Sequence, residues 1–237
     1  MRADDAFDAD EDGGFSLGSP VANDTDPDSS WLYMSLNGLT GTNGGSFSAD
    51  DSGNLIFIAG TDFDDLNVGE TRQTSYTYTV NDAEGAQAAA TVLVTVHGNN
   101  DGPVGGDDSF TVLEDDAVSL GSLTDNDSDV DSDSIQVDTS SVTTGDNGGQ
   151  FSFDDGGNLI FNPDGDFNDL GEGESRATRF NYTLFDEQGA SSLATVTVTV
   201  LGMNDSPIAV DDSFVGYEDS SITLGSLLAN DSDADGD

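Results

Sequence analysis

The sequence predicts an all-β protein built from repeated β-sandwich domains. Its apolar residues fall in short alternating runs, such as SYTYTV at 75–80 and ATVTVTV at 194–200, and a period of two is typical of half-buried strands. In the second run Val196, Val198 and Val200 are expected in the core, with the intervening threonines facing water. These runs indicate a folded chain, although a net charge of -44 and a hydrophobic content of 34% are also typical of disordered acidic chains.

Internal repetition sets the predicted domain boundaries. The stretch DDAFDADEDGGFSLGS, which begins at Asp4, returns as DDSFTVLEDDAVSLGS at Asp107 and as DDSFVGYEDSSITLGS at Asp211. The sequence therefore predicts two full repeats and the first strands and acidic loop of a third, over residues 1–102, 103–206 and 207–237.

Each full repeat divides into about seven strand-like runs, which Gly, Asp and Asn turns separate. About a hundred residues with seven short alternating strands are typical of an immunoglobulin-like Greek-key sandwich. The linkers NDGPVGGDD and NDSPIAVDD are shorter and less rich in Gly and Ser than flexible tethers. We therefore expect tandem sandwiches stacked end to end.

Composition excludes several classes of function. The chain carries 48 Asp and Glu residues against four Lys and Arg, so nucleic acids and anionic lipids would be repelled. It has no cysteine for disulfides, and it has no apolar run of the roughly 18 residues that a membrane span needs. We expect no membrane insertion by this segment, and we expect any export signal to lie outside it.

No enzyme is expected. The chain shows no Ser/His/Asp set and no phosphate-binding loop, and its Asp and Glu pairs recur with the repeat, as active sites do not normally do. His97 aligns with Leu201 and is interpreted as a strand residue. Trp31 is interpreted as a core or rim residue, with a sugar-stacking platform as the alternative.

The acidic residues are expected to converge where consecutive domains meet. In an alternating up-and-down order of seven strands, every dense acidic cluster lies at a domain end. Two carboxylates about 4 Å apart repel by roughly 1 kcal/mol in water and by more in a drier crevice, so a cation is needed among them. The residues expected at the first meeting point are Glu11, Asp12, Asp62, Asp65, Glu70, Asn100, Asp101, Asp127, Asp129, Asp131 and Asp186, and at the second Glu114, Asp166, Asp169, Glu174, Asn204, Asp205, Asp231, Asp233 and Asp235.

Calcium is the predicted cation. The loop NDSDVDSDS at 126–134 places Asp at alternate positions, and Ca²⁺ takes six to eight oxygen ligands from carboxylates, amides and carbonyls. Mg²⁺ fits less well because it retains several waters. Two alternatives stay open: solvated acidic turns, and adaptation to high salt, which explains the charge but not the spacing.

The run DDSFTVLEDDAVSLGSLTDNDSDVDSD, followed by ATVTVTVLGMND, resembles the VCBS and cadherin-like repeats of giant bacterial surface adhesins and RTX-type secreted proteins. The resemblance covers both full repeats and the visible part of the third. It implies long arrays of immunoglobulin-like sandwiches, type I secretion, a secreted or cell-surface location, and calcium-dependent stiffening or adhesion.

The resemblance also implies ligand roles. Glu11 and Glu114 stand where a first-strand glutamate binds calcium in cadherins. The linker residues Asn100, Asp101, Asn204 and Asp205, and the loop residues Asp127, Asp129 and Asp131 with Asp231, Asp233 and Asp235, match the other positions. Two departures are Pro27 and Ser29 in the first loop, beside Asp24, Asp26 and Asp28, and the absence of glycine-rich RTX nonapeptides.

These observations predict calcium-rigidified spacer repeats of a large extracellular bacterial adhesin or surface filament. The expected partners are neighbouring repeats of the same chain, with other copies of the chain and cell-surface glycans as further candidates. One alternative is a carbohydrate-binding or cell-cell adhesive module that acts through exposed sandwich surfaces. A second is a filament subunit that completes its third repeat with strands from a neighbour.

Overall fold

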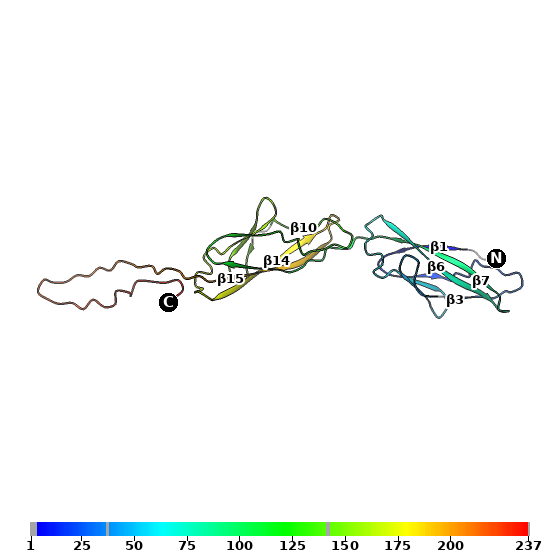
Figure 1. Ribbon diagram of the computed structural model, residues 1–237, viewed down its shortest axis with the longest axis horizontal. Helices are drawn as coiled ribbons and strands as arrows, with labels where there is room; N and C mark the ends of the chain where they lie inside the picture. The colour runs from blue at the N-terminus through cyan, green and yellow to red at the C-terminus, as the bar shows by residue number, and fades with distance from the viewer. Residues whose placement is uncertain (1–3, 37, 141–142, 237) are drawn as a thin grey trace. The chain divides into compact units, whose positions relative to one another are not determined.

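The structure is a computed structural model that describes residues 4–36, 38–140 and 143–236. Over these ranges it contains fifteen strands and no helix (Figure 1), which confirms the all-β prediction. Accordingly, no helix long and apolar enough to cross a membrane is found within the same ranges. The chain forms two compact units, Met1–Gly102 with Asp129–Ser134, and Pro103–Ser128 with Ile135–Asp237.

The first unit is a sandwich of two sheets. One has four strands in the order β1-β7-β6-β3, and the other has three in the order β2-β5-β4. Strands β1 and β7 pair in parallel, whereas the other pairs are antiparallel. The strands are β1 (Asp5–Asp10), β2 (Gly14–Gly18), β3 (Leu32–Leu36), β4 (Ser46–Ala49), β5 (Leu55–Ile58), β6 (Thr71–Asp82) and β7 (Gln87–His97).

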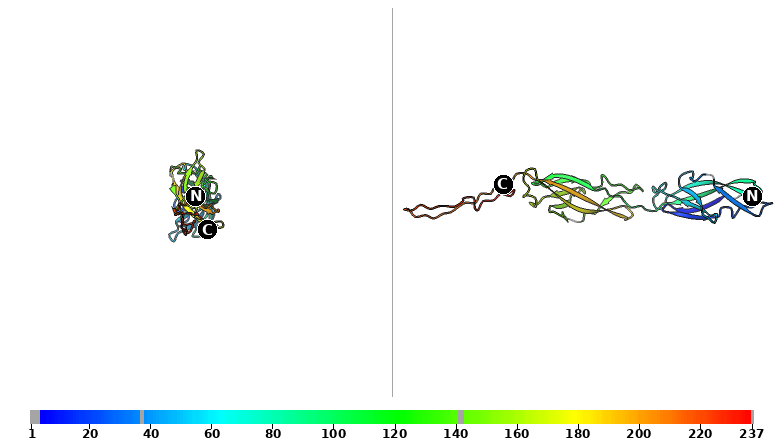
Figure 2. Two further views of the ribbon diagram at one scale, coloured as in Figure 1. Left: turned by 90° about the vertical axis from the view of Figure 1, so that its left-hand side faces the viewer. Right: turned by 90° about the horizontal axis from the view of Figure 1, so that it is seen from below.

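The second unit repeats this arrangement with one short strand more. Its sheets have the orders β10-β14-β15-β8 and β11-β12-β13-β9, and β15 and β8 pair in parallel. The layers can be followed in Figure 2. The strands are β8 (Asp108–Leu113), β9 (Val118–Gly121), β10 (Gln136–Val137), β11 (Thr143–Thr144), β12 (Gln150–Phe153), β13 (Leu159–Asn162), β14 (Ser175–Phe185) and β15 (Ser191–Leu201).

Alternating burial along the long strands produces the core of each unit. Val196, Val198 and Val200 are completely buried, as predicted, and their threonine neighbours are half-buried. Phenylalanines from the other sheet close the sandwich, with Phe151 and Phe161 in ring contact at 4.9 Å between centroids. His97 is the last residue of β7, so its interpretation as a strand residue is confirmed.

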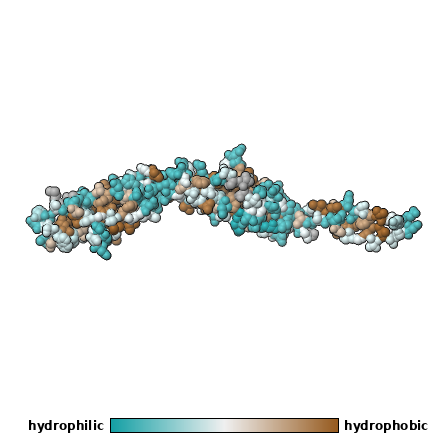
Figure 3. All heavy atoms as spheres, turned by 180° about the vertical axis from the view of Figure 1, so that it is seen from behind, coloured by the Kyte–Doolittle hydropathy of each residue, from teal (hydrophilic) through white to brown (hydrophobic). Residues whose placement is uncertain are grey.

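The strands expected at the start of the third repeat are not formed. The described part of this segment, residues 207–236, contains one isolated bridge, between Ile208 and Ser232, and no strand. In the second unit the equivalent strands β8 and β9 pair with β15 and β13, and the printed sequence contains no third copy of those partners. Apolar side chains of the segment consequently lie at its surface (Figure 3).

Candidate metal centre

The first acidic group, within the first unit, is built around Glu11. The parallel pairing of β1 with β7 continues past Asp10, because the Glu11 N–H donates to the carbonyl of His97 at 3.1 Å. This places the Glu11 carboxylate against the linker, where Oε1 accepts the N–H of Asn99 at 2.7 Å. The side chain is only 1% exposed, so Glu11 is a buried acid at a strand end.

The acidic loop at 129–134 belongs to the same unit as Glu11. Asp131 is 3% exposed, and its Oδ2 accepts the N–H of Asp101 at 2.8 Å. Its own N–H donates to Oδ1 of Asp129 at 3.0 Å. Asp129, Asp131 and Asp133 offer carboxylate oxygens that lie within 4.8 Å of one another. The alternate spacing of the aspartates thus does gather carboxylates on one side of the loop.

Asn67 contacts the acidic loop, and the sequence did not indicate this contact. Its Nδ2 donates to the backbone carbonyl of Asp131 at 2.8 Å and so fixes the acidic loop at 129–134. The equivalent position in the second unit is Gly171, which has no side chain to make this contact. A Cβ added at Gly171 would lie 3.9 Å from Cβ of Asp235. Because the repeat does not preserve the amide, comparing the repeats could not reveal it.

The second acidic group repeats the same contacts inside the second unit. Glu114 is 2% exposed, and its Oε1 accepts the N–H of Met203 at 2.6 Å. Asp205 donates its N–H to Oδ2 of Asp235 at 2.7 Å, and Asp235 donates its own to Asp233 at 3.0 Å. Oxygens of Glu114, Asp205 and Asp235 lie within 4.8 Å of one another. Two copies of one arrangement are therefore present.

Several carboxylate oxygens in these groups are buried without a hydrogen bond. Within the described ranges, Oε2 of Glu11 and Oδ2 of Asp129 have no hydrogen-bond partner, and the same is true of Oε2 of Glu114 and Oδ2 of Asp205. Buried polar atoms are normally satisfied, and a buried charge without a counterion is costly. The donor set, made only of oxygens, fits a hard divalent cation such as Ca²⁺.

The electrostatics of the first group point the same way. Burial raises the pKa of Glu11, the Asn99 N–H opposes this, and the charges of Asp101, Asp12 and Asp131 add to the rise. Burial also raises the pKa of Asp101, and Asp12 and Asp131 are the next causes. Each acid is therefore harder to ionise than in water, because burial disfavours its charged form and the charges of its acidic neighbours add to this effect.

The second group shows the same directions. Burial raises the pKa of Glu114, with the Met203 N–H opposing and Asp205 adding to the rise. The pKa of Asp205 is also raised, by burial and by the charge of Asp235. Both groups would gain free energy from a bound cation that offsets this repulsion.

The ion pairs among the described residues involve other acidic side chains. In the part of the chain that the structure describes, the ion pairs join Arg72 to Asp65 at 2.7 Å, Arg176 to Asp169 at 2.6 Å and His97 to Asp8 at 3.1 Å. Asp65 and Asp169 were expected among the cation ligands, but the structure turns them toward arginines. The hydrogen bond from the guanidinium lowers the pKa of each partner carboxyl.

The remaining predicted ligands mostly brace turns. Asp62 and Asp166 each accept a glycine N–H at 2.8 Å, from Gly45 and Gly149. Asp186, which was expected in the first group, belongs to the second unit and accepts N–H groups of its own hairpin turn. Other predicted ligands also accept N–H groups: Asp12 from the Asn99 side chain, Glu70 from Asn67, Glu174 from Gly171, Asp127 from Gly106 and Asp231 from Val210. Asn100 and Asn204 instead donate from Nδ2 to the carbonyl of the next residue.

Comparisons with known proteins identify related domains. A family model described as a bacterial cadherin-like domain matches residues 100–202, and one described as a bacterial Ig domain matches residues 1–95 and 204–237. A search of curated proteins found no match.

Solved structures of cadherin domains resemble the chain at low identity. Mouse cadherin-23 EC22-24 is 16% identical with a TM-score of 0.47, over 86% of this chain and 66% of that one. Drosophila N-cadherin EC1-4 is 14% identical with a TM-score of 0.46, over 87% and 50%. Protocadherin Gamma B2 domains 1-5 are 17% identical with a TM-score of 0.39, and the chain spans 94% of its own length and 44% of that structure.

Proposed function

We propose that the repeats of this chain are calcium-rigidified spacers of a large extracellular bacterial adhesin or surface filament. The chain belongs to the bacterial Ig domain family, and its residues 100–202 match a bacterial cadherin-like domain. The observation that carries the proposal is the pair of buried acidic groups, around Glu11 and around Glu114, in which Oε2 of each glutamate is buried without a hydrogen bond and neighbouring carboxylates add to the rise in its pKa. Buried positions of this kind are not solvated acidic turns.

Four residues of each group would hold an ion. They are Glu11, Asp101, Asp129 and Asp131 in the first unit, and Glu114, Asp205, Asp233 and Asp235 in the second. Bound Ca²⁺ would supply the positive charge that these oxygens lack. The protein's own part is to hold the carboxylates together through backbone hydrogen bonds, so that little rearrangement is needed on binding.

Chain connectivity links ion binding to stiffness. Residues 129–134 pack with the first unit, whereas Ser128 and Ile135 on either side belong to the second. An ion that fixes Asp129 and Asp131 beside Glu11 would therefore restrict the second unit through two short stretches of chain. In this proposal calcium shortens the part of the linking chain that is free to move. An extended array of such repeats would hold a distal domain away from the cell.

Calorimetric titration of the chain with Ca²⁺ tests the proposal directly. We expect saturable binding to both groups and weaker binding of Mg²⁺, because Mg²⁺ demands strict octahedral geometry and keeps several waters. Equal responses to Ca²⁺, Mg²⁺ and Na⁺ at matched ionic strength would show general screening of a negative surface and would contradict a built calcium site.

A further inference from the structure

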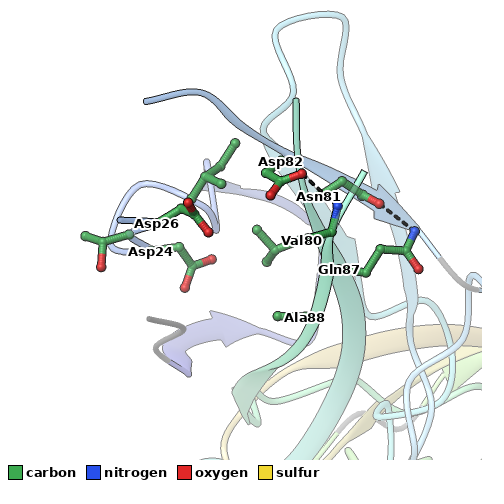
Figure 4. A pocket seen from close by; sticks show the side chains of 10 residues that line it. Asp24, Asp26, Val80, Asn81, Asp82, Gln87 and Ala88 are labelled. Carbon is green, nitrogen blue, oxygen red and sulfur yellow. Dashed lines mark hydrogen bonds between the residues drawn. The ribbon is translucent and has the colours of Figure 1, made fainter. Parts of the chain in front are cut away.

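One end of the first unit carries an open hollow that the calcium groups do not involve. It has a volume of about 450 Å³ and is lined by Trp31, Tyr33 and the turn Asp82–Gly85. A smaller hollow of about 110 Å³ adjoins it at Asp82 and is lined by Asp24, Asp26, Asn81 and Gln87, among others. Figure 4 shows Asp24 and Asp26 on one side of this smaller hollow, opposite Val80 and Asp82. We call the larger space the aromatic hollow.

Two exposed rings form one wall of the aromatic hollow. Trp31 and Tyr33 are 66% and 43% exposed, and their centroids lie 5.7 Å apart with an angle of 37° between the planes. Trp31 immediately precedes β3, Tyr33 lies within it, and the two alternate with Leu32 and Met34, which pack on the core. The rings therefore stand on the outer face of an edge strand. Trp31 was interpreted as a core or rim residue, and its exposure excludes the core but not the rim.

Hydrogen bonds in the loop before β3 fix the backbone next to Trp31. Oδ1 of Asp26 accepts the N–H groups of Asp28 and Ser29 at 2.8 Å each. The Ser29 hydroxyl then donates to the carbonyl of Trp31 at 3.0 Å. A wall that is held in the free protein requires less ordering when a ligand binds.

Negative charge forms the other wall. Asp82 and Glu84 line the aromatic hollow, and Asp24 and Asp26 lie in the adjoining one. No basic side chain is among the described residues that line either hollow, and the whole chain has a net charge of -44. This negative wall repels anionic ligands, and it does not attract a neutral ligand electrostatically.

We propose that the aromatic hollow binds an organic cation of the alkylammonium class, with a trimethylammonium group as the best fit. Ring faces attract cations because the π-system is negative there, and groups of aromatic rings recognise quaternary ammonium ions for this reason. The methyl groups would pack on Trp31 and Tyr33, while Asp82 and Glu84 offset the charge. No covalent step is involved.

The second unit provides an internal comparison. Tyr33 pairs with Asn81 across β6, and the residue in the same register of the second unit is Gln136, paired with Phe185. Two residues before Gln136 stands Ser134. The second unit therefore has neither ring, so the proposed site belongs to the first unit alone and does not repeat with the calcium groups.

Tryptophan fluorescence can report on this site, because Trp31 is the only tryptophan in the chain. The titrants are choline chloride and tetramethylammonium chloride, exchanged against NaCl at constant ionic strength. We expect a saturable change in emission with both cations and little with 3,3-dimethylbutan-1-ol, a neutral molecule of the same shape as choline. Tyr33→Ala should weaken binding about two- to fivefold, and Asp82→Asn with Glu84→Gln should weaken it further.

The controls separate this proposal from its alternatives. Tyr217→Ala removes an exposed ring outside the hollow and should leave the titration unchanged, and melting curves of each variant confirm folding. Binding of the neutral alcohol as tight as that of choline would overturn the proposal. So would a response to neutral oligosaccharides with none to choline. The response should persist in EDTA, so its loss and the failure of the calcium proposal are distinguishable.

Discussion

Calcium is expected to raise the melting temperature of this chain by about 10–20 °C relative to EDTA. A ligand that binds only the folded state adds about 2.7 kcal/mol at a hundredfold excess over its Kd, and 1 kcal/mol shifts a domain of this size by about 4–8 °C. Each unit carries one acidic group, so both units should gain. Calorimetric melts in EDTA and in millimolar Ca²⁺, at constant ionic strength, measure the shift.

The same melts across pH test the cause of the shift. Burial raises the pKa of Glu11 and of Glu114, so the folded state binds these protons more tightly than the unfolded state. In EDTA, stability should therefore rise as the pH falls from 7 toward about 5. In Ca²⁺ it should fall over the same range, because the ion needs deprotonated carboxylates.

Acidification beyond this window should reverse the gain in EDTA. The Asn54 side chain lowers the pKa of Asp50, and that of Asn158 lowers the pKa of Asp154. Such groups stabilise the fold only while they are ionised, and this contribution is lost below about pH 4. Parallel pH profiles with and without Ca²⁺ would contradict the assignment of the acidic groups as ion ligands.

Asp129→Asn with Asp131→Asn is expected to remove the gain in stability that the first unit draws from Ca²⁺, a loss of about 2–3 kcal/mol at a hundredfold excess of the ion. In EDTA the same variant should be at least as stable as the native chain, because two mutually repelling charges are gone. An asparagine oxygen can still accept the Asp101 N–H that Asp131 now accepts. The measurement is the difference between the melts in Ca²⁺ and in EDTA.

Two matched variants locate the effect. Asp233→Asn with Asp235→Asn should remove the gain of the second unit and leave that of the first. Asp51→Asn, in an exposed turn, should change neither. If the first double variant keeps the full calcium gain, or if it unfolds the second unit in EDTA, the ligand assignment fails.

The sandwich was predictable because its determinants are local. Strict alternation placed Val196, Val198 and Val200 in the core, since a slip of one residue would bury the threonines instead. Alternation was less informative at Trp31–Met34, where both faces of the strand carry large apolar side chains. There the structure shows which pair faces the core.

The acidic groups were predictable in part. The spacing of Asp129, Asp131 and Asp133 recurs at fixed intervals, and the gathering of their oxygens follows from it. The pairing of Asp65 with Arg72 was missed because the repeats were compared only at their acidic residues and not at their arginines. The signal was present, since Arg176 follows Asp169 at the same seven-residue interval.

The absence of strands from the described part of the third repeat has a different origin. Its strand-like runs, around Phe214 and Ile222, alternate as well as those of β8 and β9, but a strand forms only against a partner. Period-two patterns indicate which residues could line a sheet. They do not supply the neighbouring strand, which in the second unit comes from residues 159–162 and 191–201.

The spacer mechanism is tested most directly by the spread of distances between the two units. The chain has no cysteine, so Asp51→Cys with Asp155→Cys, both in exposed turns, gives one spin label on each unit. Pulsed electron resonance should find a narrow distance distribution in Ca²⁺ and a broad one in EDTA. Distributions of equal width in both conditions would contradict calcium rigidification.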